Sequence, residues 1–275
     1  MITHPNVKIN LGLNVLSRRQ DGYHNLETLF VPCHDFSDTL EIVTGEDFSR
    51  TVGGFEGIPV AQAISPDGKL MISVARKEGV DWDPLKDLTA KAYFLLREDF
   101  DLPPMKIFLR KESPVGTGLG GGSADAAFAL RMISSLAALD LSDQALASYA
   151  SRLGSDCAFF IYNTPMLGSG RGEILDDFPL DLGCFDIRIF VPEGISVSTA
   201  DAYRGIVPAT PSKPLKEVLL QDPSTWKEDL KNDFETTVFQ KYPALSSIKE
   251  RLYEQGALYA SMSGSGSAFF SLSYK

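Results

Sequence analysis

The residue types best suited to chemistry gather in one segment, Pro-Val-Gly-Thr-Gly-Leu-Gly-Gly-Gly-Ser-Ala-Asp-Ala-Ala at positions 114–127. Five glycines fall within seven positions there, and glycine lets another group approach the main chain closely. Good helix formers follow, and Ser123 stands where a helix N-cap is favoured. A helix start exposes N–H groups and a partial positive charge. The segment therefore predicts a phosphate-binding loop, in preference to a tight turn before a helix.

Three nucleotide-binding motifs compete for this loop. The Walker A motif requires a Lys and then Ser or Thr after its last glycine, whereas Ser123 and Ala124 follow here. The dinucleotide fingerprint is met literally by three glycines, Gly116, Gly118 and Gly121. Asp140 even supplies an acid at about the expected distance, but residues 136–140 are typical of a helix end, and the loop lies in mid-chain. The third motif, the phosphate loop of a small-molecule kinase, depends on the rest of the chain.

A second group of polar residues lies on a predicted strand over residues 6–16. Apolar side chains at alternate positions share one strand face: Val7, Ile9, Leu11, Leu13 and Val15. Polar side chains share the other face: Lys8, Asn10 and Asn14. A solvated strand face and a functional surface explain this polar set equally well.

Three shorter features carry further candidate groups. Asp21 and Gly22 predict a turn that presents Tyr23 and His24. Asp156 stands beside a strongly apolar run, where it is either a helix cap or a carboxylate at the edge of a pocket. Residues 264–266, Gly-Ser-Gly, form either a simple hairpin turn or a second glycine element of the site.

The surrounding pattern predicts the elements that position these groups. Strands are expected over 26–31, 39–43, 60–64, 70–74, 105–110, 173–175 and 186–191, and on both sides of the turn at 264–266. Helices are expected after the glycine segment, over 84–98, 139–153 and 244–255, and from residues 197 and 232 onward. This mixed order indicates an α+β protein with two packed domains.

Composition limits the classes of partner. The chain has 275 residues, 44% of them hydrophobic and 23% charged, as in a soluble globular protein. A net charge of −10 disfavours nucleic acid and anionic membrane, so a phosphate site must be locally positive. Three scattered cysteines, with no signal peptide or membrane-spanning run, indicate a reduced cytoplasmic setting. A monomer or homodimer is expected.

Taken together, the motifs resemble the GHMP kinases. The glycine segment is similar to the central motif of that family. Four further segments are similar to one of its branches, which acts on a cytidine diphosphate ester in non-mevalonate isoprenoid synthesis: residues 8–13, 21–24, 232–235 and 263–268. The chain departs from the pattern at Val7, usually Ala, at Ser113 in the strand entering the loop, and at Asp87, usually Asn. The resemblance implies an N-terminal nucleotide-binding α/β domain over 1–162 and a C-terminal ferredoxin-like domain over 163–275.

The resemblance also implies an activity: ATP-dependent phosphorylation of a hydroxyl on the methylerythritol moiety. Lys8 and Asp156 would be catalytic, with Asp156 as base and Lys8 stabilising charge. The expected ATP-binding residues are Pro114, Gly116, Gly118, Leu119, Gly120, Gly121, Gly122, Ser123, Gly264 and Ser265. The expected substrate-binding residues are Asn10, Tyr23, His24, Thr199 and Tyr203. Mg²⁺ is the expected cofactor, and Ser123 is a candidate ligand for it.

Rival functions remain open at this point. Another GHMP kinase would act on mevalonate, homoserine or a sugar, and the segment at 21–24 argues against it. A non-catalytic nucleotide-binding or regulatory protein would tolerate loss of Lys8 or Asp156, yet both are present. A dehydrogenase depends only on the accidental dinucleotide fingerprint.

Overall fold

The computed structural model describes residues 1–45 and 57–275. Contacts divide the chain into two compact units, each built from separate stretches of sequence. The first unit comprises Met1–Val7, Phe36–Pro114 and Gly121–Asn163. The second comprises Lys8–Asp35, Val115–Gly120 and Thr164–Lys275. The predicted domains are continuous stretches and these units are not, so the domain boundary after residue 162 stays a prediction.

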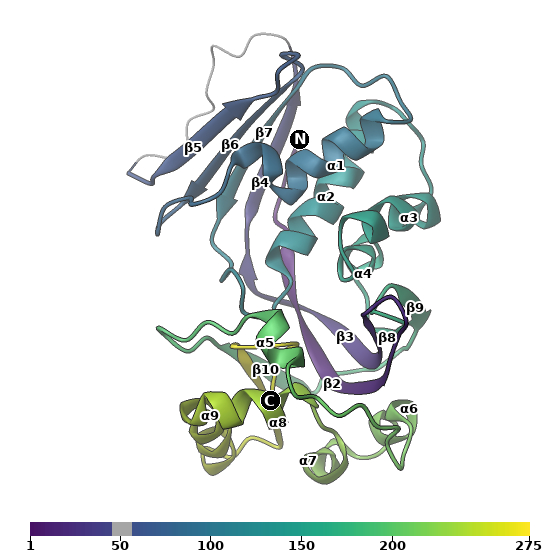
Figure 1. The fold of residues 1–275 in the computed structure, drawn as a ribbon, viewed down its shortest axis with the longest axis vertical. Helices are drawn as coiled ribbons and strands as arrows, with labels where there is room; N and C mark the ends of the chain where they lie inside the picture. Colours follow the sequence, from purple (N-terminus) through teal and green to yellow (C-terminus); the bar gives the residue numbers. More distant parts are fainter. Residues whose placement is uncertain (46–56) are drawn as a thin grey trace. The chain divides into compact units, whose positions relative to one another are not determined.

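The first unit contains a sheet with the strand order β1-β4-β7-β6-β5 (Figure 1). These strands are β1 (Ile2–Thr3), β4 (Thr39–Thr44), β5 (Val60–Ile64), β6 (Leu70–Arg76) and β7 (Met105–Lys111). β6 and β7 pair in parallel, whereas the other neighbours pair antiparallel. The predicted strands at 60–64, 70–74 and 105–110 are therefore confirmed. β7 delivers the chain to the glycine segment.

Helices cover one face of that sheet (Figure 1). Those next to the strands are η1 (Pro84–Lys86), α1 (Leu88–Arg97) and α2 (Gly121–Leu136). The helices α3 (Asp143–Leu153) and α4 (Cys157–Tyr162) pack on α2. The Asp87 side chain caps α1 by accepting the Thr89 N–H at 2.9 Å. Ser142 caps α3, which begins at Asp143 instead of at the predicted residue 139. Asp140 lies between α2 and α3, not at a strand end, which removes the main support for a dinucleotide site.

Two sequence-based expectations about helices were wrong. Ser123 is not an N-cap, because α2 already begins at Gly121 and Ser123 is its third residue. The missing side chain of Gly121 allows this early start: a Cβ there would lie 2.3 Å from Ser113 Oγ. Asp156 directly precedes α4, but its side chain makes no capping hydrogen bond. The helix-cap interpretation of Asp156 is therefore wrong.

The second unit contains a sheet with the order β2-β3-β8-β9. Its strands are β2 (Asn6–Arg18), β3 (His24–Ser37), β8 (Met166–Ser169) and β9 (Ile174–Asp177). Lys8 and Asn10 are buried on β2, as are the apolar residues beside them, so a solvated strand face is excluded. β8 was not predicted, because its glycine suggests a turn. Gly168 nevertheless lies within this strand. A Cβ at that position would stand 2.4 Å from the Phe30 ring, so the strand requires glycine there.

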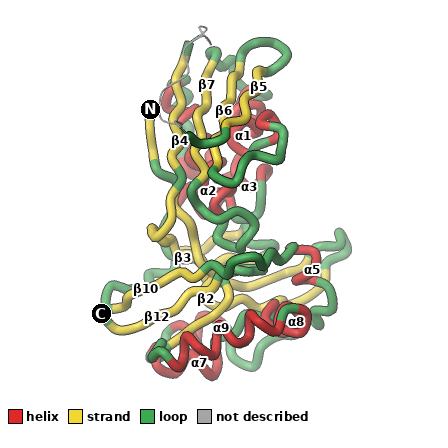
Figure 2. Tube along the Cα trace, turned by 90° about the vertical axis from the view of Figure 1, so that its left-hand side faces the viewer, coloured by secondary structure: helices red, strands yellow, loops and turns green. Residues whose placement is uncertain are grey.

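A further sheet of the second unit has the order β10-β12-β11, with antiparallel pairing (Figure 2). Its strands are β10 (Phe185–Phe190), β11 (Tyr259–Met262) and β12 (Phe269–Tyr274). The helices of the second unit are α5 (Thr199–Tyr203), α6 (Leu215–Leu219), η2 (Pro223–Thr225), α7 (Trp226–Asp229), α8 (Phe234–Lys241) and α9 (Pro243–Glu254). Val238 of α8 and Leu252 of α9 share a core with Met262 and Phe269. This mixed architecture confirms the α+β fold class.

No helix within residues 1–45 and 57–275 combines the length and apolar character needed to span a membrane.

Candidate active site

The tip of the glycine segment is fixed by a close backbone approach to the terminal hairpin. Gly118 has φ +81°, and a Cβ on it would lie 2.1 Å from the Ser263 carbonyl oxygen. The Thr117 carbonyl accepts the Ala268 N–H at 3.0 Å, and the Gly118 carbonyl accepts the Ser263 hydroxyl at 3.1 Å. Only glycine satisfies both the backbone angle and the space at position 118. The predicted turn at 264–266 is thus packed against the glycine segment within the second unit.

Lys8 and Asn10 lie against the same point of the loop. The Lys8 ammonium donates to the Gly118 carbonyl at 2.8 Å and to the Asn10 side-chain oxygen. The Lys8 backbone N–H donates to the Leu119 carbonyl at 2.9 Å. The ammonium also stands 5.5 Å from the centre of the Phe30 ring. β2 therefore holds a buried cation directly beside the predicted phosphate loop.

Neighbouring hydrogen bonds fix the orientation of this group. The Asn10 amide donates to the Thr28 hydroxyl at 3.0 Å. That hydroxyl donates in turn to the Gly12 carbonyl at 2.6 Å. The Asn232 amide donates to the carbonyls of Met262 at 2.7 Å and Gly264 at 2.9 Å. Thr28 and Asn232 were not among the predicted site residues. Asn232 carries a recognisable signal, because it opens one of the family-like segments.

An aromatic group of the second unit contains His24 and Tyr203, two of the predicted substrate residues. Their rings stack with centroids 4.8 Å apart and planes 16° from parallel. Tyr203 also packs edge-on against Phe234. Burial, with a smaller contribution from Arg18, lowers the pKa of His24 below its ordinary value of 6.5. The imidazole is therefore neutral at neutral pH and able to both donate and accept hydrogen bonds.

The other predicted substrate residues lie in this unit as well. Tyr23 is 55% exposed, and the Arg171 guanidinium stands 5.0 Å from its ring centre. Glu173 holds Arg171 in place, accepting its backbone N–H at 2.5 Å and its side-chain Nε at 3.3 Å. Thr199 Oγ1 lies 3.3 Å from Ser265 Oγ. Arg171 was not predicted, because a turn rich in glycine gives no indication of where its side chain points.

The first unit holds the start of α2 and Asp156. Cys157, the residue that follows Asp156, is buried at the start of α4. Burial raises the pKa of Cys157 to about 12, so the thiol stays neutral. Asp156 is partly buried and directly precedes Cys157 at the start of α4. Among the predicted ATP residues, Gly121 is buried here and Gly122 is exposed.

The glycine segment therefore belongs to both units. Pro114 ends one stretch of the first unit, residues 115–120 belong to the second, and Gly121 returns to the first. Gly116 and Gly120, like Gly118, have positive φ angles, of 71° and 75°. The predicted catalytic and binding residues thus fall into two groups, one around Gly118 and one at the start of α2.

Comparison with known families and structures identifies the class of protein. The model of the GHMP kinases N terminal domain matches residues 87–164, and the model of the GHMP kinases C terminal domain matches residues 214–275. The crystal structure of a homoserine kinase from Cytophaga hutchinsonii shares the fold, with a TM-score of 0.66 at 16% identity. That match covers 98% of this chain and 85% of the other. The molecule thus has the architecture of a GHMP kinase.

Closer relatives narrow the class to one branch. The 4-diphosphocytidyl-2-C-methyl-D-erythritol kinase of Bacteroides fragilis is 43% identical over 99% of this chain and 92% of its own length. That of Nitratidesulfovibrio vulgaris is 36% identical over 96% of this chain and 87% of its length. A solved 4-(cytidine 5'-diphospho)-2C-methyl-D-erythritol kinase matches with a TM-score of 0.77 and 30% identity, over 99% of this chain and 90% of that one. The chain belongs to the 4-diphosphocytidyl-2-C-methyl-D-erythritol kinase family.

Proposed function

We propose that this protein transfers the γ-phosphoryl group of ATP to a hydroxyl of 4-diphosphocytidyl-2-C-methyl-D-erythritol, giving the 2-phosphate and ADP. One observation carries the proposal for the site: Lys8 and Ser263, from distant parts of the sequence, both donate to the Gly118 carbonyl of the glycine loop, and Asn10 accepts from Lys8 beside it. A small-molecule kinase needs a cation and positioned backbone N–H groups at this place. The family membership of the chain supplies the identity of the substrate.

The roles of the two catalytic residues follow from the chemistry of phosphoryl transfer. The substrate hydroxyl must lose its proton as its oxygen attacks the γ-phosphorus, and Asp156 accepts that proton. The bond between the γ-phosphorus and the bridging oxygen breaks, and the electron pair leaves with ADP. Lys8 stabilises the negative charge that develops on the transferring group. Its ammonium is already oriented by the Gly118 carbonyl, so little reorganisation is needed during the reaction.

The glycine loop and the start of α2 bind the triphosphate. The first N–H groups of an α-helix have no partner within the helix, and they favour anions. Gly118, Leu119 and Gly120 present the main chain of the loop, while Gly121, Gly122 and Ser123 form the first residues of the helix. Gly264 and Ser265 contribute from the terminal hairpin, and Gly116 and Pro114 shape the entrance to the loop.

Mg²⁺ fits this site only as a partner of the nucleotide. No cluster of three or more His, Cys, Asp or Glu side chains suited to a metal occurs in the described part of the chain. The Ser123 hydroxyl is an oxygen ligand of the type that Mg²⁺ accepts, and the phosphate oxygens would complete the shell. When bound, the ion neutralises charge on the β- and γ-phosphates.

The substrate contacts are assigned to the aromatic group. Tyr23 offers an exposed ring face for the cytosine, and neutral His24, stacked on Tyr203, offers a polar partner for the base edge. Asn10 and Thr199 contact polar groups of the substrate. We further infer that the protein works in the reducing cytoplasm, as a monomer or homodimer.

One assay tests the proposal against its rivals. Release of ADP is followed with ATP and Mg²⁺, adding the cytidine diphosphate methylerythritol, mevalonate, homoserine or galactose in turn. We expect turnover with the cytidine compound alone. Turnover with another alcohol would assign the protein to a different GHMP activity. Nucleotide binding without turnover of any of the four would indicate a regulatory protein.

A further inference from the structure

A buried ionic cluster in the first unit is not used by the proposed mechanism. It consists of Lys111, Asp38 and Asp125, whose side chains are 5% exposed or less. The Lys111 ammonium pairs with Asp125 Oδ2 at 2.6 Å and with Asp38 Oδ2. It also donates to Ser113 Oγ at 3.3 Å. Buried charges are costly unless they are paired, so three of them in one place require an explanation.

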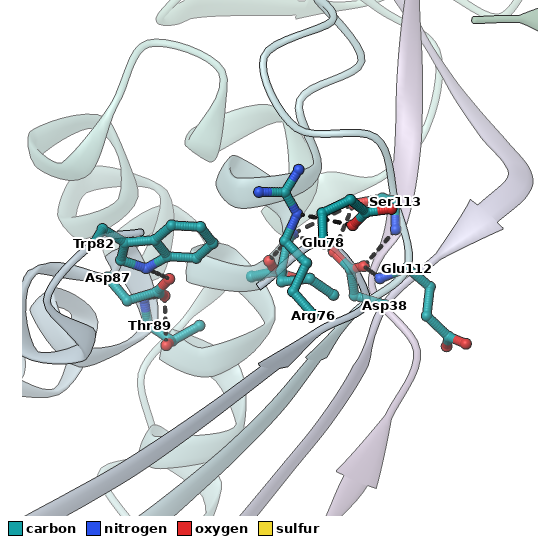
Figure 3. A network of polar contacts seen from close by, with 10 residues as sticks. Asp38, Arg76, Glu78, Trp82, Asp87, Thr89, Glu112 and Ser113 are labelled. Atoms are coloured by element: carbon teal, nitrogen blue, oxygen red, sulfur yellow. Dashed lines mark hydrogen bonds and ion pairs between the residues drawn. The ribbon is translucent and has the colours of Figure 1, made fainter. Parts of the chain in front are cut away.

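Asp38 fixes the segment that enters the glycine loop. It lies between β3 and β4, and its Oδ1 accepts the backbone N–H groups of Glu112 at 2.6 Å and Ser113 at 2.7 Å (Figure 3). Its Oδ2 accepts the Ser113 hydroxyl at 2.7 Å. Two successive main-chain N–H groups, directly before Pro114, are therefore held by a single carboxylate. Lys111, the last residue of β7, holds the other side of that carboxylate.

Asp125 fixes the segment that leaves the loop. It is the fifth residue of α2, one turn after Gly121. The same cluster also sets the path of the backbone there, because a Cβ on Gly121 would lie 2.3 Å from Ser113 Oγ and 3.6 Å from the Lys111 ammonium. Lys111 therefore connects both ends of the glycine segment, and Gly121 is the residue that fits against this connection.

The charges of the cluster are mutually dependent. Burial alone would lower the pKa of Lys111, but Asp125 and Asp38 outweigh that effect and raise it above its ordinary value. Burial raises the pKa of Asp125 well above its ordinary value, against the opposing influence of Lys111. Asp125 Oδ1 has no hydrogen-bond partner among the described residues. Removing the Asp125 charge should therefore leave a balanced pair of Lys111 and Asp38.

We propose that the Lys111–Asp38–Asp125 cluster positions the glycine loop for the nucleotide. By holding both ends of the loop at a fixed separation, it keeps the backbone N–H groups in their binding arrangement before ATP arrives. Preorganisation of this kind raises affinity by reducing the ordering that binding requires. The inference rests on the proposed function, in which this loop binds the triphosphate.

The Asp125→Asn variant tests the inference, because it removes one charge, preserves the shape and keeps the Lys111–Asp38 pair. We expect the Kd of ADP, measured by titration calorimetry, to rise about tenfold, the effect of a 1.4 kcal/mol loss. The KM of the cytidine substrate should not change. If the variant does not fold, Ser113→Ala takes its place, and its Kd should rise about threefold.

A matched control separates positioning from general stability. Ile72 is fully buried in β6 of the same unit, so Ile72→Val lowers the thermal midpoint without touching the loop. We expect its ADP affinity to equal that of the wild type. Normal ADP affinity in both Asp125→Asn and Ser113→Ala would overturn the inference and leave the cluster with a role in folding alone.

A reference variant separates failure of this inference from failure of the proposed function. Gly118→Ala places a Cβ against Ser263 and should weaken ADP binding whatever the role of the cluster. If Gly118→Ala binds ADP like the wild type, the loop is not the nucleotide site and both proposals fall. If Gly118→Ala loses affinity and Asp125→Asn does not, only the positioning role is refuted.

Discussion

Two buried lysines, one in each unit, are held in contrasting ways. Lys8 of the second unit donates to neutral oxygens, those of the Gly118 carbonyl and the Asn10 amide. Lys111 of the first unit lies between two carboxylates, Asp38 and Asp125. A carboxylate offsets the charge of a buried ammonium, so Asp38 and Asp125 balance the charge of Lys111 inside its own unit. Contact with the loop suits a lysine that acts on a phosphoryl group bound there, and pairing with two carboxylates suits one that holds a structure together.

The contrast shows that burial of a lysine does not by itself identify a catalytic residue. Both lysines stand next to the glycine loop in the sequence or in space, and both are almost inaccessible to water. They differ in what is seen to hold them: Lys8 donates to the glycine loop itself and to Asn10, whereas two carboxylates of its own unit pair with Lys111. This leads to the expectation that loss of Lys8 mainly affects turnover, while loss of Lys111 mainly affects folding.

The largest effect is expected from Lys111→Met. The substitution leaves Asp38 and Asp125 buried without their cation, and breaking a buried pair in this way typically costs about 3–5 kcal/mol. The free energy of unfolding, measured by urea denaturation, should fall by that amount. The control is Lys69→Met, which removes an exposed ion pair to Asp101 and should cost less than about 1 kcal/mol. Equal losses in the two variants would contradict the structural role of Lys111.

A loss of turnover is expected from Lys8→Ala and from Asp156→Ala. Each removes a group proposed to act on the reacting atoms, so kcat should fall by roughly 10²-fold or more. Steady-state kinetics at saturating ATP and substrate measure this effect. Asp143→Ala, which removes an exposed carboxylate at the start of α3, is the control for Asp156 and should retain normal turnover. Near wild-type kcat in either catalytic variant would refute its assignment.

The sequence predicted the local features of several residues around Gly118, but only the family resemblance suggested that they belong together, and Thr28 and Asn232 were missed. Alternation placed Lys8 and Asn10 on one face of a strand, and Gly264 marked a turn between two strands. The predicted turn lies in the hairpin of β11 and β12. Positive φ at Gly118 is also a property that its residue type suggests. These features depend on few residues at short separation, so a single sequence reveals them.

The cluster around Lys111 could not be predicted in the same way. Asp38 lies 73 residues before Lys111 and follows a strand with an ordinary pattern. The pairing of Asp38 with Lys111 depends on the register of β4 against β7, because Asp38 directly precedes β4 and Lys111 ends β7. That register is a property of the whole sheet. The predicted start of α2 was wrong for a related reason. Ser123 has the better capping side chain, but the helix begins earlier, at Gly121, which fits against Ser113. Tertiary contact therefore overrode local preference.

An effect of intermediate size is expected at Tyr23, whose ring lies next to the Arg171 guanidinium. Tyr23→Ala should raise the KM of the cytidine substrate about tenfold and leave that of ATP unchanged, as for loss of one stacking contact. Arg171→Ala should raise it about threefold, because a cation–π contact at an exposed site is weaker. Arg188→Ala, which removes an exposed pair to Asp186, is the control. A rise in the KM of ATP alone would move Tyr23 to the adenine.

The smallest effect is expected from the pH dependence of His24, a partly buried group near Arg18 instead of between carboxylates. Because its pKa is lower in the folded protein than the ordinary value of 6.5, the folded state binds fewer protons than the unfolded one. Its contribution to stability is therefore present above pH 6.5 and is lost as the pH falls through the lower, folded value. Protonation should also weaken binding of the cytosine, so the KM of the cytidine substrate should rise about twofold as the pH falls to that pKa, where half of the imidazoles are protonated.

Arg18→Ala provides the sharpest check on this expectation. Arg18 contributes to lowering the pKa of His24, so its removal should raise that pKa and move the increase in KM to higher pH. His34→Gln changes an exposed histidine on β3 and should leave the profile where it was. A KM profile that stays fixed in Arg18→Ala but disappears in His24→Gln would mean that burial alone sets the pKa. A profile unaffected by His24→Gln would remove His24 from the substrate site.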